Sequence, residues 1–407
     1  MTLAQITPKN VAMWLLGALM IIIPINYYCD PSFGVSALRV SQAQIYQVMA
    51  IALFGIFVLR NVYLCLFLLW SLFLYGYYSF PTPSGGIVIS ILGACLIYEA
   101  AYRIVNENNV KMLFKFMVWF AIANMIYMTM QRFGWELLYM EFNKVGFQDG
   151  LVGFMGLKAI MGMFFAIAMP FVAYRYPVLA LGLFIPLYIS ESSCAVAGGI
   201  AAYLWQIWHL SKKWFWILVV LLGIGGGAYV IKDTHSRMFT DRVNMWKVSL
   251  RDAVKKPLIG WGIDSFRCMT PDKQFMYWKN VRTLETERVD IRDTVEYQYT
   301  GKYDMAKYGK FMQPGDTLDP WDNPHNEFIM LFYEFGIVPL IILGFLIYDM
   351  KKRFIRYNKE LIAIIGFFFA ILIMSVGQFP FHLARIGLYI PIFLAAYYKL
   401  TDMNRLA

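Results

Sequence analysis

The chain has 407 residues, of which 59% are hydrophobic and only 15% are charged. Soluble domains carry about 25% charged residues, so this composition excludes an ordinary soluble fold and indicates that lipid surrounds much of the chain. The net charge of +10 does not indicate nucleic acid as a partner, because residues 233–323 hold 15 Lys and Arg against 14 Asp and Glu. The excess of positive charge lies in short segments between apolar runs, which is typical of membrane proteins.

About twelve apolar runs are long enough to cross a bilayer, which requires about 20 mostly apolar residues. We expect spans at 11–27, 43–59, 62–79, 85–104, 112–130, 151–170, 172–189, 193–210, 214–231, 325–348, 360–378 and 383–399. Pro186 is expected to kink the seventh span. The first run has little charge before it and no small-residue cleavage site, so we expect it to remain in the protein. The predicted fold class is an all-α polytopic membrane protein.

Basic residues alternate from one connection to the next. One set of connections carries Lys9, Arg60, Arg103, Lys111, Lys115, Arg175, Lys212, Lys213, Lys351, Lys352, Arg353, Arg356, Lys359, Lys399 and Arg405. The other set carries little beyond Arg39, Arg132 and Lys144. Because cytoplasmic loops are enriched in Lys and Arg, both termini are expected in the cytoplasm. This gives nine spans in 1–231, a large periplasmic loop at 232–324 and three spans in 325–407.

The large loop has its own internal pattern. It opens with an amphipathic helical pattern at 242–250, in which Trp246 suits a helix lying at the headgroup level. A turn-rich segment follows, Pro257-Leu-Ile-Gly-Trp-Gly-Ile-Asp-Ser-Phe266, and then a polar, tyrosine-rich stretch at 272–312. The loop is therefore expected to be a folded region with amphipathic helices rather than a linker.

The sharpest local feature is Asn323-Pro-His-Asn-Glu-Phe328, at the start of the tenth span. Asn323 is predicted to be an N-cap and Pro324 the first helical residue, which places His325 second in the helix. The positive end of the helix dipole disfavours an imidazolium there, and a neutral imidazole is a competent general base. Glu327 could orient or balance it. The alternative is an interfacial or capping histidine with no chemistry.

Ionisable residues at the ends of other spans form a second signal. Lys158 falls in the first turns of the sixth span, and Arg385 begins the last span soon after His382. Charged groups in a bilayer are costly and are candidates for function, although each could instead reach the interface and be solvated there. Glu191 is interpreted as a solvated loop carboxylate, and Arg237 by itself as an ordinary solvated charge.

Several motifs are absent from the sequence. There is no P-loop, no His-Glu-x-x-His, no Gly-x-Ser-x-Gly and no Asp-x-Asp clearly suited to a metal–nucleotide donor. The Trp-Trp-Asp signature of the Asn-linked oligosaccharyltransferases is also missing. We therefore expect no metal and no cofactor.

The second half resembles the O-antigen ligase/polymerase superfamily of bacterial envelope enzymes. The matching pieces, in order, are Arg242-x-x-x-Trp246, Pro257-Leu-Ile-Gly-Trp-Gly-Ile-Asp-Ser-Phe266, His325-Asn-Glu-Phe and Glu334-Phe-Gly-Ile337. Each piece is weak alone, but the ordered set on a twelve-span chain is fairly specific. The motifs cover about a quarter of the chain.

The resemblance implies a GT-C-like glycosyltransferase of lipopolysaccharide biosynthesis in the bacterial inner membrane. It would move a glycan from undecaprenyl diphosphate to an acceptor hydroxyl, on lipid A core or a similar glycan, on the periplasmic face and without metal. His325 would be the base, with Glu327 beside it. The candidate cations for the diphosphate are Arg242, Arg237, Lys158 and Arg385, and the candidate positioning residues are Trp246, Gly260, Gly262, Asn326, Glu334 and His382.

One position departs from the family pattern. The family often carries a Ser-Arg pair at the outer start of the span that aligns with 189–199, and this chain has Ser192-Ser193. One expected cation for the diphosphate is therefore missing. Either Lys158 or Arg385 replaces it, or the donor is held differently.

Other functions fit parts of the pattern. A polymerase of the same fold would add repeat units to a lipid-linked chain, and the spacing from Arg251 to Gly262 also fits that group, but the single large loop favours a ligase. A protein-directed O-oligosaccharyltransferase usually has a longer C-terminal extension. A polysaccharide-lipid transporter or flippase would need polar residues or broken helices at the bilayer midplane, often in paired repeats.

The predicted topology can be tested with a reporter inserted within 272–312. An enzyme that is active only outside the cytoplasm should be active at that position. A reporter that functions only in the cytoplasm should be silent there, and a strong signal from it would overturn the orientation.

Overall fold

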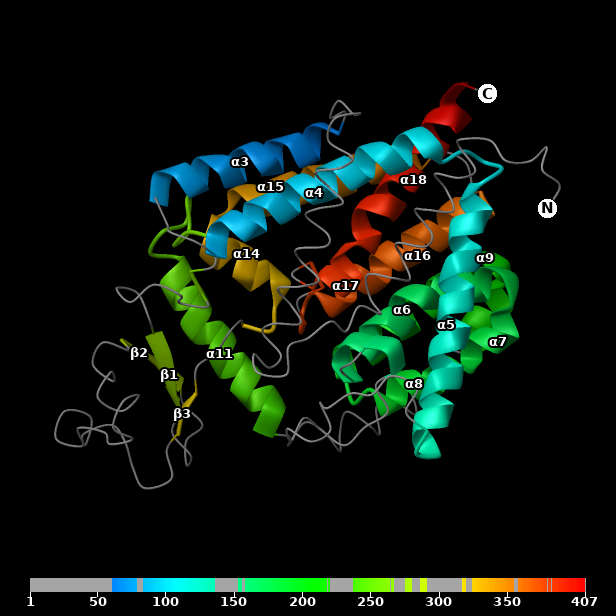
Figure 1. Cartoon of the computed structure of the whole chain (residues 1–407), viewed down its shortest axis with the longest axis horizontal. Coiled ribbons are helices and arrows are strands. Elements are labelled where there is room, and N and C mark those ends of the chain that lie inside the picture. Colours follow the sequence, from blue (N-terminus) through cyan, green and yellow to red (C-terminus); the bar gives the residue numbers. More distant parts are fainter. Residues whose placement is uncertain are drawn as a thin grey trace. The chain divides into compact units, whose positions relative to one another are not determined.

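The computed structural model describes residues 61–78, 83–135, 153–155, 158–217, 219, 237–263, 265–266, 275–279, 286–290, 317–319, 324–354, 358–378, 380–381 and 383–406. Most of these residues are helical, as the sequence predicts (Figure 1). Within them, three helices are long and apolar enough to cross a membrane, at Ile87–Ile104, Val110–Arg132 and Lys158–Arg175. The predicted spans at 11–27 and 43–59, and most of the span at 214–231, lie outside the described residues, and the total of twelve spans stays a prediction.

Described helices overlap the predicted spans from 62–79 to 193–210 and from 325–348 to 383–399, and a further helix lies in the predicted loop. They are α3 (Val62–Tyr78), α4 (Pro83–Ile104), α5 (Val110–Arg132), α6 (Lys158–Arg175), α7 (Pro177–Leu181), α8 (Phe184–Ile189), α9 (Ser193–Leu210), α11 (Arg237–Ala253), α14 (Glu327–Phe335), α15 (Val338–Arg353), α16 (Lys359–Met374), α17 (Ala384–Gly387) and α18 (Tyr389–Leu406). A short 3₁₀ helix lies at Gly153–Met155. Several spans that we expected to be continuous are divided.

The boundary between the sixth and seventh predicted spans was wrong. Helix α6 runs through Pro170 and ends at Arg175, because the following residue, Tyr176, precedes Pro177 and leaves the helical region with a ψ of 72°. The next helical stretch then breaks into α7 and α8. Pro186 is the third residue of α8, where its missing N–H removes no helical hydrogen bond, so Pro186 does not kink a longer helix as predicted.

The chain packs as two compact units, each built from separate stretches of sequence. The first unit comprises Met1–Cys65, Ile89–Val220 and Ile347–Ala407. The second comprises Leu66–Val88 and Leu221–Leu346. The candidate motifs of the large loop and the start of the tenth span therefore belong to the same unit, the second.

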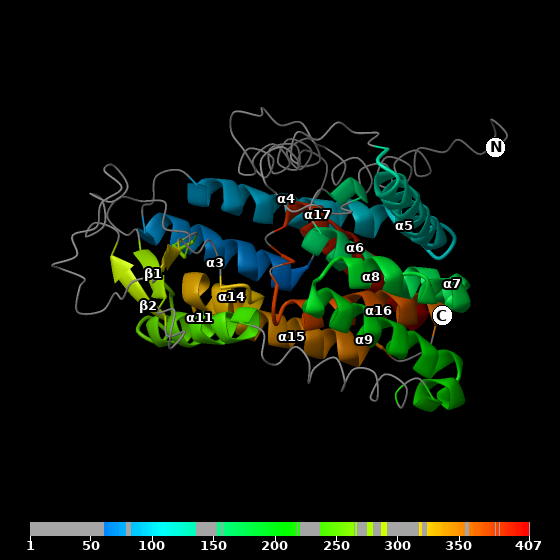
Figure 2. The same cartoon turned by 90° about the horizontal axis from the view of Figure 1, so that it is seen from below.

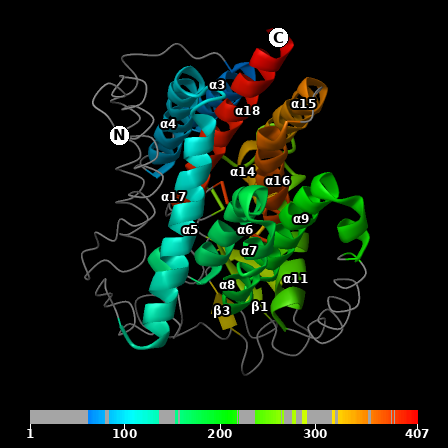
Figure 3. The same ribbon diagram turned by 90° about the vertical axis from the view of Figure 1, so that its right-hand side faces the viewer.

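Helix α6 forms the centre of the first unit. It packs against α5, α9 and α16, and the last two also pack against each other (Figure 3). Every residue from Ile160 to Ala173 is buried. Phe171 stacks on Phe393 of α18 at 4.5 Å between ring centroids and lies 4.8 Å from Phe114 of α5. An aromatic and apolar core of this kind explains why α6 tolerates an internal proline, since its neighbours hold it in place.

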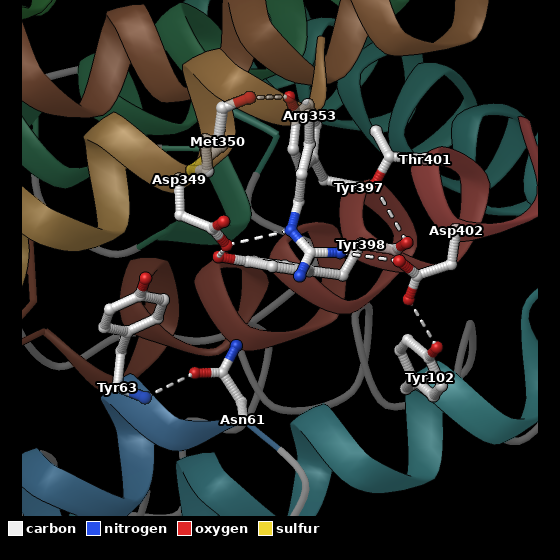
Figure 4. A network of polar contacts seen from close by, with 10 residues as sticks. All are labelled: Asn61, Tyr63, Tyr102, Asp349, Met350, Arg353, Tyr397, Tyr398, Thr401 and Asp402. Atoms are coloured by element: carbon white, nitrogen blue, oxygen red, sulfur yellow. Dashed lines mark hydrogen bonds and ion pairs between the residues drawn. The ribbon is translucent and has the colours of Figure 1, made fainter. Parts of the chain in front are cut away.

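A polar network joins α4, α15 and α18 of the first unit (Figure 4). Arg353 donates hydrogen bonds to Asp349 at 2.9 Å and to Asp402 at 2.6 Å, and its guanidinium lies 4.6 Å from the centre of the Tyr398 ring. Tyr102 donates to Asp402 and Tyr398 donates to Asp349, each at 2.7 Å. Both carboxylates are therefore partnered, and the network connects three helices rather than presenting a reactive group.

The second unit combines α11 and α14 with a small sheet. The strands are β1 (Phe275–Lys279), β2 (Thr286–Asp290) and β3 (Thr317–Asp319), in the order β2-β1-β3 with both pairings antiparallel. Helix α11 packs against α14 and also against β2 (Figure 2). The sequence predicted amphipathic helices in this loop and did not predict these strands. Strands β1 and β2 lie within the polar, tyrosine-rich stretch at 272–312, and the aromatic residues of β1 favour a strand.

The tenth predicted span, 325–348, is divided at a glycine. Helix α14 ends at Phe335, Gly336 has a φ of +76°, and α15 begins at Val338. Three backbone hydrogen bonds join this break to the turn-rich segment: Trp261 N–H to Tyr333 at 2.8 Å, Gly262 N–H to Glu334 at 3.0 Å, and Ile337 N–H to Pro257 at 2.8 Å. We call these two segments, 257–262 and 333–337, the clasp.

Glycine is required where the two segments of the clasp approach each other. A Cβ atom at Gly336 would overlap the carbonyl group of Leu258, and a Cβ atom at Gly260 would lie 2.6 Å from the carbonyl carbon of Glu334. In both cases the obstructing atoms belong to the backbone, so no rotation of a side chain can relieve the overlap. The clasp therefore fixes the direction in which α14 leaves the turn.

A substitution series in α14 and α15 tests this constraint. Gly336→Ala should lower the stability of the protein by about 3 kcal/mol or more, because it combines backbone overlap with an unfavourable positive φ. Gly344→Ala is the matched control, since nothing lies within 4 Å of a Cβ there and alanine favours a helix. Thermal unfolding in detergent should separate the two variants, and equal melting temperatures would contradict the role of Gly336.

Candidate functional site

His325 has an unusual backbone conformation. Its φ is +48°, in the left-handed region that non-glycine residues rarely adopt. A residue held there costs about 1–3 kcal/mol and persists only when its surroundings impose the conformation. Such residues cluster at functional sites, so the groups that impose the conformation on His325 are informative. The side chain is partly exposed, while Pro324 and Asn326 on either side of it are buried.

The predicted start of the helix was wrong by several residues. Helix α14 begins at Glu327, and its N-cap is Asn326, whose side chain accepts a hydrogen bond from the N–H of Ile329 at 3.0 Å. Asn323 was predicted for that role, with His325 second in the helix. Asn326 replaces it because a positive φ at His325 excludes a helical turn there, and the amide of Ile329 still needs an acceptor. His325 therefore precedes the helix.

Trp246 holds the other side of His325. Its indole Nε1–H donates a hydrogen bond to the carbonyl of Pro324 at 2.8 Å, across 78 positions of sequence. His325 thus lies between two anchors, the Trp246 bond before it and the Asn326 cap after it. The first contact holds the peptide group before the histidine and the second holds the side chain of the residue after it, so the chain is anchored on both sides of the strained position.

Arg242 lies on the same face of α11 as Trp246. The two residues are one helical turn apart, and Ser249 and Ala253, which continue this face, are buried while Arg251 is exposed. Since α11 packs against α14, this is the face turned toward α14. Arg242 is partly buried and, with Trp246, belongs to the side of α11 that faces the helix preceded by His325. Arg237 is the first residue of α11, and its side chain lies outside what the structure describes.

Two carboxylates of α14 are fully buried, Glu327 and Glu334. Glu327 is the first residue of the helix, where the free amides favour a negative charge. Glu334 belongs to the clasp: its backbone carbonyl accepts from Gly262, and its side-chain Oε1 accepts from the N–H of Phe266 at 3.4 Å. Glu334 therefore joins the turn to α14 with both its backbone and its side chain.

Small apolar and aromatic contacts complete this arrangement. Ala253, Phe266 and Tyr333 form a buried cluster against which Trp261 packs. The indole N–H of Trp261 donates to the backbone carbonyl of Asp252 at 2.8 Å, which joins the turn to the end of α11. The histidine, the arginine face and the clasp are thus parts of one packed unit.

The remaining predicted residues belong to the first unit. Lys158 is the first residue of α6, and its ammonium forms an ion pair with Glu191 at 3.0 Å. We interpreted Glu191 as a solvated loop carboxylate, and sequence reasoning missed this partner because the two residues are 33 positions apart with no shared motif. Arg385 lies in α17, and its side chain is not among those described. His382 lies outside the described residues.

No family model matches the chain, and no curated protein matches its sequence. Among the described residues, no group of three or more His, Cys, Asp or Glu side chains could hold a metal ion. The motif residues quoted in the second half of the sequence, except Asp264, lie in the described part of the second unit, and the family they were taken to indicate stays a prediction.

The anchor at Trp246 can be tested by hydrogen–deuterium exchange. Trp246→Phe keeps an aromatic ring but removes the N–H donor, so amides in 325–332 should exchange roughly fivefold faster, as expected for the loss of one hydrogen bond of about 1 kcal/mol. Trp214→Phe is the control, since Trp214 is exposed on the first unit. Unchanged exchange in the Trp246 variant would remove Trp246 as an anchor.

Proposed function

We propose that this protein is a membrane glycosyltransferase that moves a glycan from undecaprenyl diphosphate to an acceptor hydroxyl, with His325 as the general base. The observation that carries the proposal is the left-handed backbone of His325 between the Trp246 and Asn326 anchors. A base must be held within hydrogen-bond reach of the proton that it removes, and a partly exposed histidine anchored on both sides in the chain is suited to that role.

The reaction balances without an added oxidant or nucleotide. The acceptor hydroxyl gives its proton to the imidazole of His325, and its oxygen attacks the anomeric carbon of the glycan. The bond between that carbon and the phosphate oxygen breaks, and undecaprenyl diphosphate leaves with the electron pair. The donor is already activated, so the protein needs to supply a base and positive charge, which contribute through proton transfer and electrostatic stabilisation.

Arg242 is the proposed cation for the departing diphosphate. A guanidinium binds phosphate oxygens through two parallel hydrogen bonds and keeps its charge at all relevant pH values. Its position one turn before Trp246 places it on the same face of α11 as the residue that anchors the histidine segment. Glu327, buried at the first position of α14, is proposed to orient the base or balance its charge.

A lipid-borne donor accounts for the membrane character of the chain. Three described helices are long and apolar enough to cross a bilayer, and the distribution of basic residues in the sequence favours a periplasmic location for the large loop. We propose the periplasmic face of the bacterial inner membrane as the place of reaction. The single large loop favours a ligase acting on lipid A core or a similar glycan, and a polymerase would use the same chemistry with a lipid-linked acceptor.

Replacing the base is the main test of the proposal. His325→Ala and His325→Gln should each lower glycan transfer by a factor of about 10²–10⁴, the usual contribution of a general base. The assay uses purified protein in lipid vesicles with an undecaprenyl diphosphate-linked glycan. His209→Gln, on α9 of the first unit, should keep full activity. Transfer at the normal rate by both His325 variants would reject the mechanism.

A second pair of variants separates the arginine from general effects of charge. Arg242→Ala should raise the KM for the lipid-linked donor by about tenfold or more, because a charge-assisted contact of about 1.5–3 kcal/mol is lost. Arg251→Ala removes an exposed arginine of the same helix and should leave that KM unchanged. An unaltered donor dependence in Arg242→Ala would remove Arg242 from the site.

A further inference from the structure

The ion pair between Lys158 and Glu191 is uneven in its exposure. The side chain of Lys158 is only 14% exposed, while that of Glu191 is 70% exposed. Their atoms are 3.0 Å apart. A largely buried ammonium needs an anionic partner, because an unpaired charge away from water is costly. The exposed carboxylate has no such need, since water can replace its partner with little change in free energy.

The turn that carries Glu191 is held rigidly against α6. Ser190 is buried and its hydroxyl donates to the carbonyl of Leu187 at 2.6 Å, while Ser192 caps α9. A Cβ atom at position 162 would overlap the Ser190 hydroxyl, so only glycine allows this approach. Position 162 lies one helical turn after Lys158 on the same face of α6. The turn is therefore fixed beside the lysine.

We propose that Lys158 and Glu191 form an anion-exchange site, in which Glu191 holds the buried ammonium until a phosphate-bearing ligand takes its place. A diphosphate carries more negative charge and more acceptor oxygens than a carboxylate, so it competes well for the ammonium. Glu191 can then turn outward to water. The choice of a diphosphate as the occupant rests on the proposed function. The site itself lies wholly in the first unit, and the contacts of Lys158, Glu191 and Ser190 support it independently of that function.

The sequence contains no signal for this role of Glu191. A serine–arginine pair was expected at the two positions after Glu191, and the chain has Ser192 and Ser193 there instead. In this structure Ser192 caps α9 and Lys158 supplies positive charge beside the same turn. Because Glu191 occupies the ammonium of Lys158, a ligand can bind this lysine only after it has displaced Glu191.

Binding of two probes to the purified full chain tests the proposal. Undecaprenyl diphosphate and inorganic pyrophosphate are titrated separately, which distinguishes a lipid headgroup from a free phosphate. Glu191→Gln removes the competing charge and should tighten binding roughly fivefold. This is the change in affinity expected when the ligand no longer has to break a partly exposed ion pair. Lys158→Gln should weaken binding, and the double variant should behave like Lys158→Gln. Glu107→Gln, at an exposed turn, should change nothing.

The outcomes divide clearly. Tighter binding in Glu191→Gln that disappears in the double variant supports the exchange site, for whichever probe shows it. Unchanged or weaker binding in Glu191→Gln, or normal binding in Lys158→Gln, overturns it and leaves the pair as a structural link between α6 and the turn before α9.

A measurement on the unaltered protein guards against variants that fail to fold. Pyrophosphate should slow acylation of Lys158 by an amine-reactive reagent, as read by mass spectrometry, while Lys111, which is 57% exposed and pairs with Glu360, should react as before. Equal protection of both lysines, or of neither, would overturn the proposal. If binding follows the expected pattern but no glycan is transferred, the proposed function fails alone. If transfer depends on His325 but Glu191→Gln leaves binding unchanged, the exchange site fails alone.

Discussion

The close approach of two backbone segments at Gly336 is the constraint on which the second unit depends. Only glycine fits against the Leu258 carbonyl, and the hydrogen bonds that flank this contact set the direction of α14. The N-cap of that helix then holds the residue after His325, while Trp246 holds the peptide before it. The strained conformation of His325 therefore depends on the position of α14, which in turn depends on the glycine at 336.

The two units use charge in different ways. In the first unit, Arg353 forms ion pairs with Asp349 and Asp402, and these pairs join the helices that carry them. Lys158 has one exposed carboxylate as its partner, which a stronger anion can displace. In the second unit, buried carboxylates lie on the helix that His325 precedes, and the arginine belongs to the helix packed against it. Burial and exposure, rather than charge alone, separate structural ion pairs from candidate binding groups.

Sequence reasoning succeeded where a single physical signal dominates. The eighth apolar run, 193–210, has the same bounds as helix α9, although α9 is not among the described helices that are long and apolar enough to cross a membrane. It failed where neighbouring residues compete, as Asn323 and Asn326 do for the N-cap of α14. It could not find the Trp246 hydrogen bond or the Glu191 ion pair, because contacts across 78 and 33 positions leave no local pattern. The small sheet was missed because its strands are too short to show a clear alternation.

The proposed function requires transfer of a glycan from a lipid diphosphate with protein groups alone. The most direct measurement counts the products of a single reaction in a metal chelator, with purified protein, undecaprenyl diphosphate-linked glycan and an acceptor glycan. The account predicts that each glycan transferred releases one undecaprenyl diphosphate, at a rate that the chelator does not change. Release of undecaprenyl monophosphate, a loss of activity with the chelator, or no transfer to any acceptor hydroxyl would contradict it.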